Sequence, residues 1–328
     1  MLLHVTEPAG LIRADEPVRI GVPLPKGAVH DVSELMLDVP GGDSPQLQAR
    51  ALARWSDGSV QWALLDTLVS LPAGQTLQLW LKKGAVKSGG PSVKVLRQDG
   101  ALAVDTGAAT FKVPCRGSTL IESVHCGGSE MLGSGGVGIN FLDGKGRSKR
   151  PLIHRARVDD EGPVRATLRL DGHIEGTDRR RPLQFVASLA FTAGSAVVQV
   201  DFRIRNPRRA RHKGGLWDLG DPGSQHIREL GLQVTPAGAP DRLQYNTGPA
   251  QPPVQARDLS GWVLYQDSSG GRALGFPKSP RGRWQAHGQL PRLPGAGWQR
   301  SRPGIRGPGY ALCRTCPSRG GNRLRGRG

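Results

Sequence analysis

The sequence lacks the features on which several protein classes depend. Its 328 residues hold only four cysteines, and aromatic side chains make up 5% of the chain. No apolar run approaches the roughly 20 residues that a membrane-spanning helix needs. Residues 1–20 have neither the basic start nor the apolar run of a signal peptide. Few cysteines without a secretion signal predict reduced thiols, a cytoplasmic location and no membrane partner.

The familiar catalytic and cofactor motifs are missing as well. The chain has no phosphate-binding glycine loop, no HExxH zinc motif and no GxSxG between a strand and a helix. A glycine-rich stretch at 133–138 precedes no helix pattern. Cys313 and Cys316 form a single CxxC, which His287 alone does not complete as a zinc site. We therefore expect no cofactor and no metal, and we assign no catalytic residue.

Acidic residues are absent from the C-terminal segment 277–328, which carries eleven Arg and one Lys. The formal net charge of the whole chain is +18, whereas residues 1–276 hold 33 basic and 27 acidic side chains. The strongly basic balance is thus mainly a property of the tail. It predicts no specific nucleic-acid partner, because an arm of this kind attracts nucleic acid through charge alone.

The same segment lacks the residues that build a core. It contains no Val, no Phe and one Ile, but eleven Gly and seven Pro, which predicts disorder. With suitable codons, a frame shifted by one nucleotide from Ala273 gives a stretch of balanced charge with a strand-like pattern. We therefore predict that residues 277–328 are a frameshift product, which the nucleotide sequence of the gene would test.

What is present is the alternation of antiparallel β-strands. Apolar residues alternate on both sides of the Ser-Asp-Gly-Ser turn at 56–59, which predicts a hairpin. This alternation places Trp55 and Trp62 on apolar faces, so we expect core packing rather than a sugar-binding surface. A second hairpin is predicted from residues 183–191 and 196–204, with Val198, Val200, Phe202 and Ile204 pointing inward.

One long connection concentrates polar groups between two predicted strands. Residues 205–224 read RNPRRARHKGGLWDLGDPGS, and connections of this length more often carry function than shorter ones. A tryptophan beside polar groups suits sugar stacking, and clustered arginines suit a uronate carboxylate. An Asp-Pro-Gly turn whose carboxylates cap the local backbone, with the indole packed under the loop, is the structural alternative. The candidate substrate-binding residues are Arg211, His212, Trp217, Asp218 and Asp221.

Several stretches together resemble one known family. RIGVPLPKGAV, LQARALARWSDGSVQWALLD, NPRRARHKGGLWDLGDPGS and GWVLYQDSSGG occur in the order found in YetA-like proteins. Those proteins are similar to exo-rhamnogalacturonan lyases of polysaccharide lyase family 26. The resemblance covers residues 18 to about 271, and GLWDLGDPGS is its most specific part.

The resemblance implies an all-β fold in three parts. We expect a small RIFT-type barrel at 1–88, an incomplete antiparallel β-sandwich at 89–276 and a disordered basic tail at 277–328. Members of the family continue into a C-terminal α/α toroid, for which we expect no counterpart in this chain. A sandwich that lacks its last strands exposes an edge and part of its core, so we expect a poorly soluble or partly unfolded second module.

For function, the resemblance implies β-elimination on a rhamnogalacturonan (pectin) chain. That chemistry needs a cation at the uronate carboxylate, a base for the C5 proton and an acid for the leaving oxygen. Because most of these groups lie on the toroid in toroid-plus-sandwich lyases, we expect this truncated chain to be inactive alone and to have an acidic oligosaccharide or polysaccharide as its partner. The alternative is a non-catalytic carbohydrate-binding or interaction protein built from two β modules.

Overall fold

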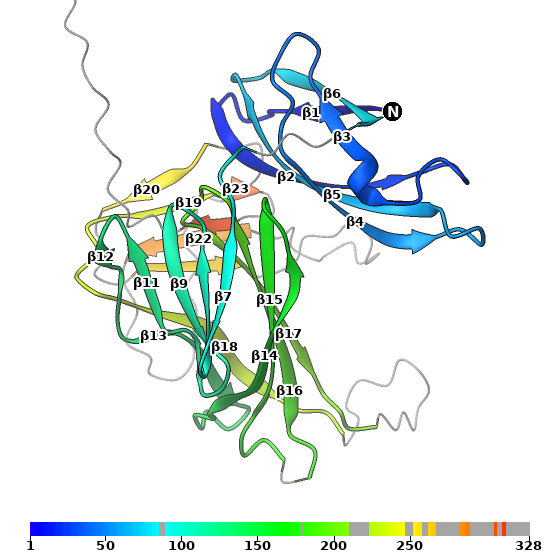
Figure 1. Cartoon of the computed structure of the whole chain (residues 1–328). Helices are drawn as coiled ribbons and strands as arrows, with labels where there is room; N and C mark the ends of the chain where they lie inside the picture. Colours follow the sequence, from blue (N-terminus) through cyan, green and yellow to red (C-terminus); the bar gives the residue numbers. More distant parts are fainter. Residues whose placement is uncertain are drawn as a thin grey trace, which may run out of the picture. The chain divides into compact units, whose positions relative to one another are not determined.

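The computed structural model describes residues 1–84, 89–178, 180–209, 223–246 and 252–257, and the short strands 262–266, 283–288, 305–306 and 310–312. In this part of the chain it contains 24 strands and one short 3-10 helix, which confirms the all-β prediction. The chain divides into two compact units (Figure 1). The first comprises Met1–Ser92, Gly162–Arg165 and Ala239–Arg314, and the second comprises Val93–Glu161, Ala166–Gly238 and Thr315–Gly328.

The N-terminal part of the first unit consists of two three-stranded antiparallel sheets, in the orders β1-β6-β3 and β2-β5-β4. Its elements are β1 (Leu2–Thr6), β2 (Arg13–Pro23), the 3-10 helix η1 (Val32–Glu34), β3 (Leu35–Asp38), β4 (Leu47–Arg54), β5 (Val60–Leu71) and β6 (Thr76–Lys83). The predicted hairpin at 56–59 is confirmed, since β4 and β5 pair on either side of it.

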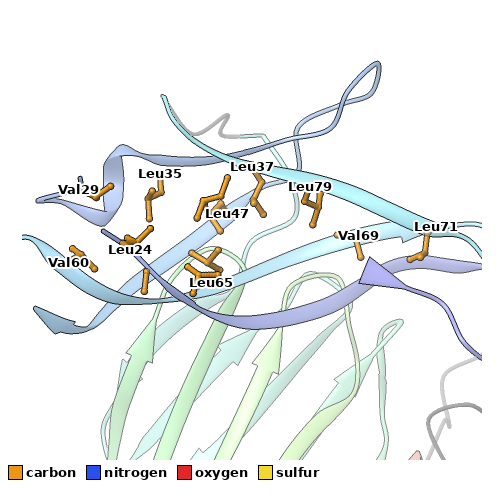
Figure 2. Packing of buried hydrophobic residues seen from close by; sticks show 13 residues of the cluster. Leu24, Val29, Leu35, Leu37, Leu47, Val60, Leu65, Val69, Leu71 and Leu79 are labelled. Atoms are coloured by element: carbon orange, nitrogen blue, oxygen red, sulfur yellow. The ribbon is translucent and has the colours of Figure 1, made fainter. Parts of the chain in front are cut away.

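A single apolar core lies between these two sheets. Leu37 on β3 and Leu79 on β6 point toward Leu65 on β5, as Figure 2 shows. Each of the three side chains is at most 2% exposed. The alternation of apolar residues along the strands produces this core, because neighbouring residues of a strand point to opposite faces.

A buried carboxylate fixes the connection between β1 and β2. The Glu7 side chain is 1% exposed and accepts two hydrogen bonds from Arg13, at 3.1 Å from Nε and 2.9 Å from Nη2. It also accepts from the backbone N–H groups of Ala9, Leu11 and Gly74. Burial alone would raise the pKa of Glu7, but these donors outweigh it and lower the pKa to about 2.

This pKa predicts a pH-dependent stability. Because the folded pKa lies below the ordinary value of 4.5, Glu7 stabilises the fold above that value, and the contribution disappears as the pH falls toward about 2. We expect Glu7→Gln to lower the melting temperature at neutral pH, and the difference from wild type to shrink across this acid range. Thermal melts at a series of pH values measure it. The exposed Glu16, 3.9 Å from the same arginine, is the matched control, and Glu16→Gln should show almost no effect.

The described strands of the second unit form three antiparallel sheets. The first has the order β12-β11-β9-β8-β7, the second β14-β15-β16-β17 and the third β10-β13-β18. The strands are β7 (Lys94–Gln98), β8 (Ala101–Asp105), β9 (Ala109–Pro114), β10 (Thr119–Ile121), β11 (Ser123–Cys126), β12 (Ser129–Glu130), β13 (Leu132–Asp143), β14 (Pro151–Glu161), β15 (Arg165–Ile174), β16 (Leu183–Thr192), β17 (Val198–Arg205) and β18 (Ile227–Pro236).

Aromatic contacts occur both between and within the sheets of the second unit. Phe111 on β9 contacts Phe191 on β16 with ring centroids 5.0 Å apart, and Phe185 on β16 stacks on Phe202 of β17 at 5.3 Å. The predicted second hairpin is confirmed, because β16 and β17 pair with Phe185 opposite Ile204 and Phe191 opposite Val198. Its apolar residues therefore share the face that the alternation predicts.

The remaining described strands follow β18 in sequence. They are β19 (Leu243–Asn246), β20 (Val254–Ala256), β21 (Trp262–Gln266), β22 (Arg283–Gly288), β23 (Ile305–Arg306) and β24 (Tyr310–Leu312). The last three belong to the segment for which we predicted disorder. Most of that segment lies outside the described residues, so its disorder stays a prediction, as do the frameshift and the domain boundaries.

The two described cysteines differ in burial. Cys115 is a free, partly buried thiol. Cys126 is buried, and the expectation of reduced thiols throughout the chain stays a prediction.

Candidate functional site

The predicted site lies on the connection from β17 to β18. All five candidate residues, Arg211, His212, Trp217, Asp218 and Asp221, fall outside the residues that the structure describes. Their role in substrate binding therefore stays a prediction. What the structure describes are the two ends of the connection, residues 206–209 and 223–226.

Direct hydrogen bonds join these two ends. The side-chain amide of Asn206 donates through Nδ2 to the carbonyl oxygen of Gly223 at 2.8 Å, across 17 residues of sequence. Its Oδ1 accepts from the backbone N–H of Arg208 at 3.1 Å, a local turn that asparagine commonly forms. Asn206 therefore holds the start and the end of the connection together.

Arg208 is the second anchor of the connection. Its Nη2 donates to Oδ2 of Asp178, which lies on the turn between β15 and β16. With the amide of Gln225 oriented so that its oxygen faces the guanidinium, that oxygen accepts from Nη1 and Nε at 3.2 and 3.1 Å. The guanidinium thus binds a neighbouring turn on one side and the far end of its own connection on the other.

Asp178 is itself held in place. Its Oδ1 accepts from the backbone N–H groups of Arg180 and Arg181 at 2.8 and 2.7 Å. The bond from Arg208, followed by the two from these backbone groups, lowers the pKa of Asp178 to about 2. Asp178 is therefore ionised at neutral pH and accepts only, so it is a structural counter-ion for Arg208.

The surroundings of this ion pair are basic. Arg180, Arg181 and Arg209 are exposed next to it in sequence, whereas Asp178 is already bound by Arg208. An exposed arginine can bind a carboxylate with two parallel hydrogen bonds. The described part of the site therefore offers cations to an anionic ligand, although Arg208 serves mainly as an anchor.

We predict that Arg208 orders the connection while the adjacent Arg209 does not. Replacement by Ala at position 208 removes the ion pair with Asp178, and we expect the melting temperature to fall by about 2–4 °C, the change that one partly exposed charged contact supports. We also expect faster proteolysis within 206–226. Arg209→Ala is the control and should leave both measurements unchanged. Equal behaviour of the two variants would contradict the anchoring role.

The structure overturns our prediction for Trp55 and Trp62. Their exposed fractions are 36% and 43%, so neither is a core residue. Strand β5 buries Val60, Ala63 and Leu65, and register shifts on both sides of Ala53 in the β4–β5 ladder break the simple alternation on which the prediction rested. A β-bulge of this kind changes which face a side chain occupies.

Trp55 is nevertheless fixed in position. Its indole Nε1 donates to the carbonyl oxygen of Leu24 at 3.0 Å. Leu24 follows Pro23, which pairs with Trp62 across the β2–β5 ladder. The end of the first unit that carries the β4–β5 turn thus presents two tryptophans whose rings are partly open to solvent.

The described residues show neither a metal-binding cluster nor a membrane-spanning helix. No group of three or more His, Cys, Asp or Glu side chains in them is placed to hold a metal ion. Among the same residues, no helix is long and apolar enough to cross a membrane.

Comparison with known families decides what these units are. The model of the PcRGLX-like N-terminal RIFT barrel domain matches residues 10–91. The model of the PcRGLX-like protein central beta sandwich domain matches residues 93–234. The chain belongs to the PcRGLX-like family. This confirms the family that the sequence resembled, with its barrel and its β-sandwich.

Individual proteins that match this PcRGLX-like chain share a low sequence identity with it. It is 25% identical over 301 residues to "Uncharacterized protein YetA" of Bacillus subtilis (strain 168), an alignment covering 85% of this chain and 33% of the relative. A solved structure of a protein in the glycosyl hydrolase family 38 from Enterococcus faecalis matches with a TM-score of 0.44 and 10% identity. That match covers 81% of this chain and 37% of the other. The chain thus spans about a third of the length of each.

Proposed function

We propose that this chain provides the two β modules of a rhamnogalacturonan-lyase-like protein, which bind an acidic pectic polysaccharide but do not cleave it alone. The match of residues 10–234 to two successive domains of the PcRGLX-like family carries the proposal. Because the chain spans only 33% of the length of YetA, the activity of a longer family member need not reside in these residues.

The described end of the candidate site supports an anionic ligand. Arg180, Arg181 and Arg209 are exposed there, and the ion pair of Arg208 with Asp178 joins the turn that carries the first two to the connection that carries the third. A uronate carboxylate is the group in pectic polymers that a cluster of arginines binds. In this proposal Trp217 provides a stacking surface and Arg211 and His212 provide polar contacts, with Asp218 and Asp221 accepting from sugar hydroxyls.

Binding and cleavage are tested separately with the purified chain. Titration with rhamnogalacturonan oligosaccharides should give saturable binding, and Trp217→Ala should weaken it. Absorbance near 235 nm, roughly where an unsaturated uronate product absorbs, should not rise. A steady rise would overturn the claim that the chain is catalytically incomplete, and absence of any binding would overturn the polysaccharide role.

A second candidate is carbohydrate binding by the first unit without any relation to cleavage. The exposed indoles of Trp55 and Trp62 favour it, because aromatic rings stack on sugar faces. Under this alternative Trp62→Ala, and not Trp217→Ala, should weaken oligosaccharide binding. Trp80, which is 39% exposed on the other sheet of the unit, is the matched control, and Trp80→Ala should leave binding unchanged.

A further inference from the structure

Strand β18 of the second unit exposes a row of apolar side chains. Leu230, Leu232 and Val234 are 43%, 47% and 51% exposed. They share one face of the strand, because successive side chains alternate between its two faces. Monomeric proteins seldom leave three adjacent aliphatic residues of one strand face open to water.

This row continues a buried surface. In the β13–β18 ladder Leu230 lies opposite Phe141 and Leu232 lies opposite Ile139. Phe141 and Ile139 are only 1% and 8% exposed. Directly opposed residues lie on the same face of a sheet, so the core surface of β13 extends along β18 without a cover over its outer half.

The backbone of β18 is open as well. Among the described strands, β18 pairs with β13 on one side and has no neighbour on the other. Proteins usually protect such an edge with charged residues, prolines or a short length. β18 is ten residues long, carries no charge between Leu230 and Thr235, and reaches a proline only at its last position, Pro236.

We propose that β18 pairs with β18 of a second copy of this chain, antiparallel about a two-fold axis at Gly231. The pattern of the strand is self-complementary in this register. Leu230 lies opposite Leu232 of the second copy, Glu229 lies opposite Gln233, and Arg228 lies opposite Val234, against which the aliphatic part of its side chain can pack. No like charges are opposed, and the leucines of the two copies form one continuous apolar surface across the axis.

Gly231 suits a position on the axis. A Cβ added to it would meet no atom within 4 Å in the single chain, so the space at the axis is open. Glu229, which lies two residues before the axis, already accepts a hydrogen bond from the side-chain amide of Asn140. Its carboxylate is thus held on the face opposite to the leucines and away from the apolar contact.

The oligomeric state of the full chain tests the proposal. Sedimentation over a wide range of concentrations should show a monomer–dimer equilibrium. Leu232→Lys places a charge opposite a leucine and should raise the dissociation constant at least about tenfold. The matched variant Gln233→Lys adds the same charge one residue away, opposite Glu229, and should leave the dimer intact or tighten it. A wild-type chain that is monomeric throughout, or an unchanged Leu232→Lys dimer, would overturn the proposal.

Three further variants protect the test against simple misfolding and fix the register. Val234→Thr keeps the shape and the strand preference of the side chain, so a dimer weakened without loss of circular dichroism supports the apolar contact. Gly231→Cys places two thiols across the axis, within the Cα separation of about 4.4–6.8 Å that a disulfide spans. It should form a covalent dimer on oxidation, whereas Gln233→Cys should not. The reverse result would overturn the register.

Discussion

Replacement of Gly172 by Ala is expected to prevent stable folding of the second unit. Gly172 lies on β15 opposite Ile153. Because glycine has no side chain, the ring of Phe185 occupies the space where a Cβ would lie. A Cβ there would lie 2.2 Å from Cζ of Phe185 and 2.5 Å from the carbonyl oxygen of Leu152. Phe185 is 1% exposed and packed on Phe202, so its ring has no free space to enter. We expect a loss of about 3 kcal/mol or more in the free energy of unfolding.

A matched glycine in the same unit provides the control. Gly138 also lies within a strand, β13, and a Cβ added to it would meet only the carbonyl oxygen of Ser118, at 4.0 Å. Gly138→Ala should therefore be neutral or slightly stabilising, because alanine loses less conformational entropy than glycine on folding. Urea unfolding, followed by the amide hydrogen exchange of strands β13 to β18, measures the stability of both variants. Similar stability of the two variants would contradict the close packing at Gly172.

Leu65→Ala is expected to have the second large effect, on the first unit. Leu65 is 2% exposed and lies between the two sheets near Leu37 and Leu79 (Figure 2). Its strand, β5, is central in its sheet, with Ile20 of β2 on one side and Ala49 of β4 on the other. Removing its side chain leaves a cavity that these paired strands cannot close. We expect a loss of about 2–5 kcal/mol, the usual range for a buried leucine.

The same leucine-to-alanine replacement at a solvent-exposed position separates the effect of lost core packing from the effect of the changed residue type. Leu52 lies on the adjacent strand β4 and is 53% exposed. Leu52→Ala should change the free energy of unfolding by no more than about 0.5 kcal/mol. Because the chain has two units, the unfolding of the first must be followed by a probe within it, such as the fluorescence of its own tryptophans. A large effect at Leu52 would mean that this side chain is covered in solution.

Some elements followed from the sequence alone because they depend on local periodicity. The pairing of β16 with β17 and the face on which Val198, Val200, Phe202 and Ile204 lie follow from strict alternation between apolar and polar residues. The turn at 56–59 follows from its Asp-Gly pair, since glycine tolerates the positive φ of 82° found at Gly58.

The anchors of the candidate site did not follow in this way. Asp178 and Arg208 are 30 residues apart, and the sequence offers several arginines near each as equally good partners. The order of the strands determines which guanidinium meets the carboxylate. Asn206 and Gln225 were missed for the same reason, although the Asn-Pro pair that ends β17 is a signal for a local turn. The five predicted binding residues stay untested by the described part of the structure.

The sequence by itself determined the all-β class, its main hairpins and the family, because all three are carried by short patterns that need no knowledge of the fold. Only the tertiary structure decided which face holds Trp62, which arginine pairs with Asp178 and which strand is left open at Leu230 to Val234. A bulge reverses the orientation of every residue after it, and pairing across a sheet depends on segments far apart in the chain. These properties arise from packing, which alternation along one strand does not encode.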